Sequence, residues 1–243
     1  MLNKFWKFNK VTNANEKIEN VLTINGYIAQ ESWFMDDVTP QIFKSELSSY
    51  NGDVTVWVNS PGGDCFAASQ IYTALKEHKG SINVKIDGIA ASAASVIAMA
   101  GDMVEMSPTA MMMLHNPALN LFGEVSELER GIEFLNEVKE SIINAYQMKT
   151  GLSRAKISKI MDAETWFNAK SAIDMGLCDR MLYAEDTVAP KEDIEGFTFN
   201  KLAMVTNTVS AMKSKLKTIE KPKGEDITQF ETRLNLLSGG KRI

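Results

Sequence analysis

Short apolar runs alternate along the middle of the chain with segments whose apolar residues recur three and four positions apart. Residues 54–58, Val-Thr-Val-Trp-Val, and residues 82–86 are β-branched runs that predict buried strands. Between them, residues 64–80 have the spacing of an amphipathic helix, with Asp64 to cap its start and Gly80 to end it. This rhythm of strand, helix and strand is typical of right-handed βαβ units. It predicts an α/β fold with a mainly parallel sheet.

The same patterns predict further elements on both sides. These are a strand over residues 21–28 broken at Asn25-Gly26, a helix over 40–49, strands over 103–106 and 110–114, a long helix over 124–150, and short helices over 153–161 and 168–176. The long helix would have about seven turns. Because this is more than one small core needs, we expect part of it to pack on another subunit.

The two ends of the chain differ from its middle. Residues 1–20 are polar and rich in asparagine, and we interpret them as an N-terminal arm. Residues 21–183 form the predicted domain, and 44% apolar residues in the whole chain are enough for a core. Residues 184–243 are expected to be a C-terminal extension, partly disordered or helical, with at most one helix over about 201–219.

Composition and charge exclude several classes of protein. Lys and Arg number 26 against 31 Asp and Glu, a net charge of -5, which gives no electrostatic reason to expect a nucleic-acid partner. Cys65 and Cys178 do not form a disulfide framework or a metal-binding pattern, so we expect no metal and no cofactor. No segment approaches a membrane span or a secretory signal. We therefore expect a cytoplasmic protein without a membrane partner.

The chain contains two histidines, which limits the search for a general base. His78 falls in the last turn of a predicted helix among lysines, where a solvated or capping role is favoured. His115 ends an apolar strand and is followed by Asn116-Pro117, so its imidazole can project into a cleft. Taken alone, His115 fits a structural and a catalytic role equally well.

Serines lie within the run of small residues from Asp87 to Asp102. Ser92 falls where a strand turns into a helix, a position that exposes its hydroxyl and lets the Ala93 N–H point at a developing oxyanion. The turn ending at Gly63 can offer a second N–H, because glycine allows close backbone approach. Ser95 is the competing nucleophile, but its hydroxyl is expected to bond back to a helix carbonyl.

Four motifs occur in order within residues 21–183. They are Asn59-Ser-Pro-Gly-Gly63, Gly88-Ile-Ala-Ala-Ser92, Leu114-His-Asn-Pro117, and Glu164-Thr-Trp-Phe-Asn-Ala169 followed by residues 172–179. Together they resemble the proteolytic subunit of the Clp proteases, and most closely the Clp-like head maturation proteases of tailed phages and prophages. An ordered set of four motifs is far more specific than any one of them.

The resemblance implies the roles of individual residues. It implies Ser92 as the nucleophile, His115 as the general base, and the backbone N–H groups of Gly63 and Ala93 as the oxyanion hole. The Clp pattern has Met at the position of Ala93 and usually Gln at the position of Asn116. Neither departure removes a catalytic group.

The acid that orients the histidine is also implied by the resemblance. Glu164 stands where the family has an aspartate, and Asp162, two residues earlier, is the alternative. A glutamate can orient an imidazole, although its extra methylene changes its reach.

The resemblance further implies a crotonase-like, Clp-type spiral of ββα units, with the helix over 124–150 as a handle that joins stacked rings. The implied function is a serine endopeptidase enclosed in a homo-oligomeric chamber. Its polypeptide substrates would be capsid or scaffold precursors in a bacterial host cytoplasm or an assembling phage head. Whether an ATPase unfoldase is a partner stays open.

Three alternatives remain. The same fold hosts acyl-CoA hydratases and isomerases, which use an oxyanion hole without a serine and histidine pair. Relatives that cleave signal peptides use a serine and lysine pair and usually a membrane anchor. A ring-forming structural subunit without catalytic activity is the third. The presence of both Ser92 and His115 argues against the first, the lack of a membrane anchor segment argues against the second, and the intact catalytic motifs argue against the third.

Overall fold

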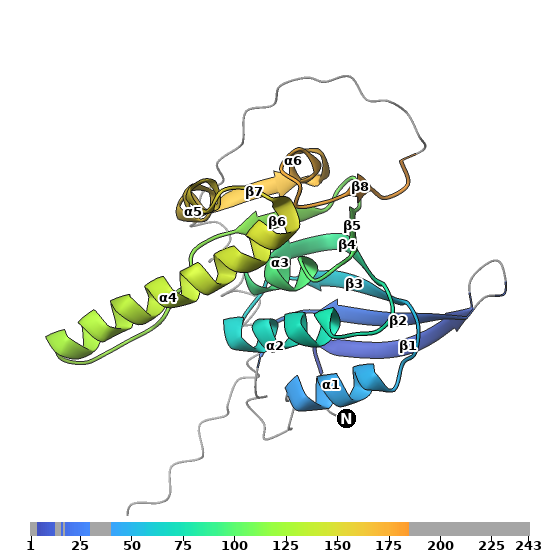
Figure 1. The fold of residues 1–243 in the computed structure, drawn as a ribbon, viewed down its shortest axis with the longest axis horizontal. Coiled ribbons are helices and arrows are strands. Elements are labelled where there is room, and N and C mark those ends of the chain that lie inside the picture. The colour runs from blue at the N-terminus through green and yellow to red at the C-terminus, as the bar shows by residue number, and fades with distance from the viewer. Residues whose placement is uncertain (1–3, 13–15, 17, 30–39, 185–243) are drawn as a thin grey trace, which may run out of the picture. The chain divides into compact units, whose positions relative to one another are not determined.

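A mixed sheet of eight strands organises the described part of the chain (Figure 1). The computed structural model describes residues 4–12, 16, 18–29 and 40–184. The strands are β1 (Trp6–Thr12), β2 (Ile18–Asn25), β3 (Val54–Ser60), β4 (Ile82–Ala91), β5 (Met103–Met106), β6 (Met111–Leu114), β7 (Thr165–Asn168) and β8 (Arg180–Met181).

The sheet is parallel through its centre and antiparallel at two places. The path runs β1-β2-β3-β4-β5-β8, and β6 pairs with both β4 and β7. Strands β2, β3, β4 and β5 run parallel to one another, and the pairs β5–β8 and β4–β6 are also parallel. The pairs β1–β2 and β6–β7 are antiparallel. The predicted α/β class with a mainly parallel sheet is therefore confirmed.

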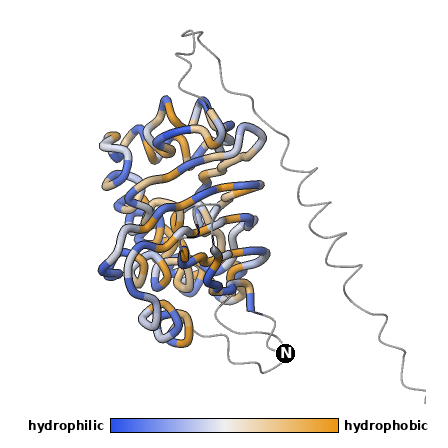
Figure 2. The backbone as a smooth tube through the Cα atoms, turned by 90° about the vertical axis from the view of Figure 1, so that its right-hand side faces the viewer, coloured by the Kyte–Doolittle hydropathy of each residue, from blue (hydrophilic) through white to orange (hydrophobic). Residues whose placement is uncertain are grey.

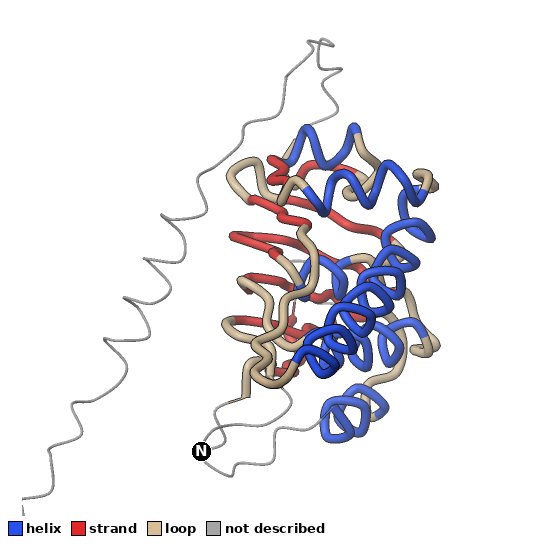
Figure 3. Tube along the Cα trace, turned by 90° about the vertical axis from the view of Figure 1, so that its left-hand side faces the viewer, coloured by secondary structure: helices blue, strands red, loops and turns tan. Residues whose placement is uncertain are grey.

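Six helices occur among the described residues, and Figure 3 shows helices gathered on one side and strands on the other. They are α1 (Pro40–Ser48), α2 (Cys65–Lys76), α3 (Ala93–Ala98), α4 (Val125–Thr150), α5 (Arg154–Asp162) and α6 (Ala169–Asp174). The predicted N-caps Asp64, Ser153 and Asn168 are confirmed, since each side chain accepts a backbone N–H of the first turn.

Buried and exposed side chains alternate along the central strands. Alternate residues of β3, Val54, Val56 and Val58, are fully buried, while Thr55 and Trp57 between them are partly exposed. Figure 2 shows the corresponding interleaving of hydrophobic and hydrophilic residues along the backbone. This alternation indicates a sheet with one face on the core and the other nearer to solvent.

Strand β1 differs from the prediction for residues 1–20, which were expected to form an arm. It pairs along its whole length with β2, from Trp6 opposite Ile24 to Thr12 opposite Ile18. Trp6 is buried, and its Nε1–H donates to Glu46 Oε2 at 2.8 Å. The polar composition that suggested an arm is that of an edge strand with a solvated face. The extension expected over 184–243 lies, beyond residue 184, outside the described residues.

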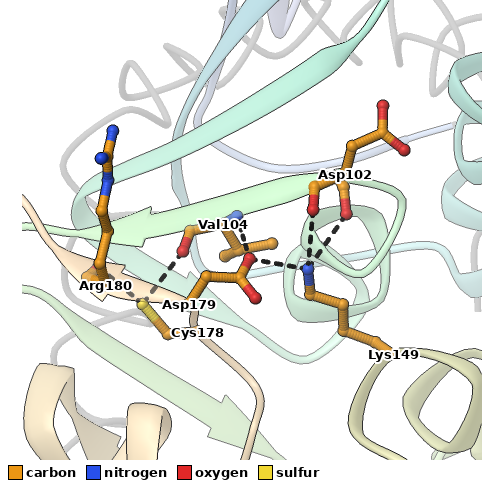
Figure 4. Close-up of polar contacts among 7 residues, drawn as sticks. Asp102, Val104, Lys149, Cys178, Asp179 and Arg180 are labelled. Carbon is orange, nitrogen blue, oxygen red and sulfur yellow. Dashed lines mark hydrogen bonds and ion pairs between the residues drawn. The ribbon is translucent and has the colours of Figure 1, made fainter.

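The C-terminal end of α4 is anchored to the sheet. Lys149 Nζ donates to Asp179 Oδ2 at 2.8 Å and contacts the carbonyl oxygens of Gly101 and Asp102 at 3.3 Å each (Figure 4). Asp179 Oδ2 also accepts the N–H of Val104 at 2.6 Å. Because Lys149 is largely buried, these bonds fix the last turn of α4 against β5.

The N-terminal part of α4 has a different environment. Its buried residues, Ile143, Ala145 and Tyr146, all lie in the second half of the helix. Val125 is 70% exposed and Ile132 is 61% exposed. The helix was predicted to be longer than one core needs, and its first half accordingly presents apolar side chains that the other described residues do not cover.

Candidate active site

Ser92 lies at the sharp turn between β4 and α3. Its backbone has φ 55° and ψ -126°, a conformation that residues other than glycine rarely adopt. The Ser92 N–H donates to the carbonyl of Met113 in β6 at 2.9 Å, which holds the turn to the sheet. A strained residue persists only where its surroundings impose it, and such residues cluster at functional sites.

His115 meets Ser92 across the ends of two paired strands. The last residues of β4 pair in parallel with β6, with Ala91 opposite Met113, so the residues that follow both strands emerge at the same edge. His115 Nε2 lies 2.7 Å from Ser92 Oγ. At this distance a neutral imidazole can accept the serine proton.

Two backbone N–H groups border the serine. Among the described residues, the N–H of Gly63 and the N–H of Ala93 have no hydrogen-bond acceptor. The turn that carries Gly63 is held by Ile28, whose N–H donates to the Gly62 carbonyl at 2.9 Å and whose carbonyl accepts the Asp64 N–H at 2.8 Å. Donors that are fixed and unsatisfied can stabilise an oxyanion.

Gly62 allows this turn to approach the serine. A Cβ at this position would lie 2.6 Å from the Ala91 carbonyl oxygen and 2.7 Å from Ser92 Cβ, and its φ is +98°. The two short distances exclude a larger residue because its side chain would clash, and the positive φ excludes it because its backbone would be strained.

Two hollows adjoin the serine and histidine. A cavity of about 150 Å³ is lined by Gly63, Cys65, Ser92, Ala93, Val96, His115, Pro117, Ala118, Ile142 and Tyr146. A larger one of about 560 Å³ shares Gly63, Cys65, Pro117 and Ala118 with it and extends to the exposed aromatic rings of Tyr27, Phe66 and Phe134. The reacting groups therefore face concave surfaces with both polar and apolar parts, of the kind that receive side chains of a substrate.

Glu164 lies at the same end of the β6 and β7 pair as His115. Strands β6 and β7 are antiparallel, with Leu114 opposite Thr165. His115 follows Leu114 directly and Glu164 precedes Thr165 directly, so both residues lie at the same end of this strand pair. Glu164 has a φ of 47°, so the chain turns sharply as it enters β7.

Asp162, the alternative acid, is engaged by other residues. Its Oδ1 accepts from Lys139 Nζ at 2.6 Å and from Asn116 Nδ2 at 2.9 Å. These hydrogen bonds, first that of Lys139 and then that of Asn116, lower the pKa of the Asp162 carboxyl below its ordinary value. The contacts give Asp162 a structural role at the C-terminus of α5.

The remaining polar candidates lie elsewhere. His78 Nε2 is 2.7 Å from the Gly52 carbonyl, beside a separate cavity of about 350 Å³ that shares no residue with the site around Ser92. Cys65 and Cys178 are free thiols, and burial raises the pKa of Cys178 to about 11. Within the described ranges, no group of three or more His, Cys, Asp and Glu side chains is arranged to hold a metal ion.

Sequence reasoning missed Tyr146, which lines the smaller cavity. Ser95, predicted to bond a helix carbonyl, does donate to the Ser92 carbonyl at 2.6 Å, and it also meets the Tyr146 hydroxyl at 2.8 Å. The available signal was a tyrosine on the apolar stripe of a helix, because a buried tyrosine hydroxyl usually requires a partner.

A serine at a strand-to-helix turn, a histidine within hydrogen-bond distance of its hydroxyl, and two backbone N–H groups without an acceptor among the described residues form an arrangement typical of serine hydrolases. The comparison with known proteins gives the family. Residues 10–185 match the model of the Clp protease family, and the chain belongs to this family. None of the helices in the described part is long and apolar enough to cross a membrane.

Individual relatives agree with this assignment. The chain is similar to the ATP-dependent Clp protease proteolytic subunit 1 of Bifidobacterium longum, with 30% identity over 150 residues, which are 60% of this chain and 64% of that protein. It is 28% identical over 152 residues to the subunit 1 of Chlamydia abortus, covering 61% of this chain and 79% of the relative. A proteolytic subunit of Porphyromonas gingivalis is 26% identical over 155 residues, which cover 61% and 70% of the two chains.

Proposed function

We propose that the chain is a serine endopeptidase that hydrolyses peptide bonds through an acyl-enzyme. The observation that carries the proposal is the 2.7 Å contact between His115 Nε2 and Ser92 Oγ in a member of the Clp protease family. Membership of this family supports peptidase activity. The contact brings together the nucleophile and the general base that the serine mechanism needs.

The reaction uses the groups around Ser92 in sequence. Ser92 Oγ attacks the scissile carbonyl carbon while its proton moves to His115 Nε2, and the N–H groups of Gly63 and Ala93 stabilise the oxyanion. When the carbon-nitrogen bond breaks, His115 gives the proton to the leaving amine. A water then attacks the acyl-enzyme with His115 again as base, which releases the carboxylic acid and free Ser92. Glu164 orients the imidazole throughout.

The proposal extends to the assembly and its substrates. The exposed apolar residues in the first half of α4 support a handle that packs on a second copy of the chain, so that rings of a crotonase-like spiral fold enclose the site. The motifs shared with head maturation proteases support capsid or scaffold precursors as substrates in a host cytoplasm. The names of the relatives support an ATP-dependent partner for folded substrates.

Cleavage of an unfolded polypeptide tests the proposal. Wild type is expected to degrade a casein-like substrate without ATP, Ser92→Ala to lose this activity, and Ser69→Ala, which changes an exposed serine of α2, to retain it. Equal activity of Ser92→Ala and wild type would contradict the proposal. Hydration of crotonyl-CoA without peptide cleavage would instead indicate the acyl-CoA class.

A further inference from the structure

Tyr146 of α4 is connected to the backbone of Ser92 through a single side chain. Its hydroxyl oxygen lies 2.8 Å from Ser95 Oγ, and Ser95 Oγ donates to the Ser92 carbonyl oxygen at 2.6 Å. Ser95 is fully buried and Tyr146 is 1% exposed. Helices α3 and α4, which carry the two hydroxyl groups, contact each other (Figure 1).

The direction of this chain of bonds follows from counting protons. A carbonyl oxygen only accepts, so the single proton of Ser95 is used on the Ser92 carbonyl. Ser95 Oγ therefore accepts from Tyr146, whose hydroxyl is the donor. Burial raises the pKa of Tyr146, and the hydrogen bond with Ser95 opposes this only in part, so the phenol keeps its proton.

The Ser92 carbonyl belongs to the same peptide unit as the Ala93 N–H. A trans peptide is planar, so its C=O and N–H point in opposite directions and rotate together. The Ser92 carbonyl also accepts the Ser95 N–H at 2.9 Å. Fixing this carbonyl within the first turn of α3 fixes the Ala93 N–H on the other side, where it borders the cavity beside Ser92.

We propose that Tyr146 and Ser95 are positioning residues that aim and polarise the Ala93 N–H as an oxyanion donor. This inference rests on the proposed function, since it concerns the same site. Two effects contribute. The bonds to the carbonyl prevent the peptide from rotating away from ψ -126° at Ser92, a residue whose φ of 55° makes its conformation a strained one that must be held. They also polarise the peptide, because hydrogen bonds in a chain strengthen one another.

The arrangement makes the hydrogen-bonding state of the site depend on α4. Tyr146 lies five residues before Gly151, near the end of α4 that Lys149 anchors. A shift of this helix would lengthen the bond between Tyr146 and Ser95. The pair therefore connects the packing of α4 to transition-state stabilisation without touching the substrate's reacting atoms.

The test compares Tyr146→Phe, Ser95→Ala and the double variant with Tyr72→Phe as a control. Tyr72 is a tyrosine whose hydroxyl has no partner among the described residues, so its removal deletes the same atom without breaking a bond. The readouts are kcat and KM for a fluorogenic peptide, the inhibition constant of a peptide aldehyde whose adduct places an oxyanion beside Ser92, and the Tm.

We expect kcat to fall about 3- to 10-fold in Tyr146→Phe and about 10- to 100-fold in Ser95→Ala, below the 10²- to 10³-fold loss of a whole oxyanion donor. The KM should change by less than about twofold, because the interaction acts on the transition state. Aldehyde affinity should fall in parallel with kcat, and Tyr72→Phe should match wild type. The double variant should be no worse than Ser95→Ala, since both hydroxyl groups act through one carbonyl.

Several results would overturn the inference. One is Ser92-dependent cleavage with kcat and aldehyde affinity unchanged in both single variants. Others are a kcat loss without a loss of aldehyde affinity, and fully additive losses in the double variant. Ser95→Ala could fail to fold because it leaves the Tyr146 hydroxyl unpaired. In that case the double variant, which removes both hydroxyl groups, is compared with Tyr146→Phe, and their kcat values and aldehyde affinities test the inference. Wild type without Ser92-dependent cleavage would refute the proposed function, and the inference would fall with it.

Discussion

His115 Nε2 lies 2.7 Å from Ser92 Oγ, although 23 positions separate the two residues in the chain. The contact exists because β4 and β6 are parallel neighbours and both end at this edge of the sheet. A hydrogen bond between a base and a hydroxyl is the geometric requirement for activating a serine.

Replacement of His115 tests the general base. We expect His115→Ala to lower kcat/KM about 10²- to 10⁴-fold, the usual contribution of a positioned base. His78→Ala is the matched control and should resemble wild type, because His78 bonds the Gly52 carbonyl away from the site. Steady-state cleavage of a fluorogenic peptide checks both. Full activity of His115→Ala would indicate a serine and lysine mechanism instead.

The two candidate acids are distinguished by amide substitutions. Glu164→Gln should lower kcat about 10²-fold or more, because an amide no longer stabilises the imidazolium that forms during attack. Asp162→Asn should lose less than about tenfold, since Asp162 bonds Lys139 and Asn116. The opposite order of the two kcat values would identify Asp162 as the acid.

Asp162 should instead affect stability in a pH-dependent way. Its carboxyl pKa is lowered in the folded protein, so the contribution is fully present above the unfolded value of about 3.9 and is lost as the pH falls through the lower folded value. The Tm of wild type minus that of Asp162→Asn should be positive at about pH 7 and shrink below about pH 4. A difference that stays constant with pH would contradict this assignment.

The approach of Gly62 to Ser92 predicts different outcomes at two glycines with positive φ. Gly52→Ala should lose about 1 to 2 kcal/mol of unfolding free energy from backbone strain, and Gly62→Ala should lose more, because a clash adds to the same strain. At Gly52 a Cβ meets nothing within 4 Å, whereas at Gly62 it would lie 2.7 Å from Ser92 Cβ. Activity assays should therefore find Gly52→Ala active and Gly62→Ala inactive. An active Gly62→Ala would show that the turn can move without cost to the site.

Part of this arrangement was predictable from the sequence. The β-branched runs predicted the central strands because their burial follows directly from local pattern. The chain has two histidines, and only His115 stood at the end of a predicted strand. The sequence therefore predicted that His115 pairs with Ser92, and the fold places these two side chains in contact.

Other features depend on contacts that local pattern does not encode. Strand β1 is polar on its solvated face, and its pairing with β2 is supported by the burial of Trp6 against Phe43, a contact between distant segments. The bond between Tyr146 and Ser95 depends on where α4 crosses α3. Helical periodicity predicts which face of α4 is buried, but not the partner of one hydroxyl group on that face.

Identification of the residue that a fluorophosphonate modifies tests whether Ser92 is the nucleophile. Peptide mapping by mass spectrometry should find the phosphonyl group on Ser92 of wild type, no modification in Ser92→Ala, and slower modification of Ser92 in Ser95→Ala. These results are expected because Ser92 Oγ is the hydroxyl that His115 contacts. Modification of Ser95 or of another serine, with Ser92 unmodified and peptide cleavage intact, would contradict it.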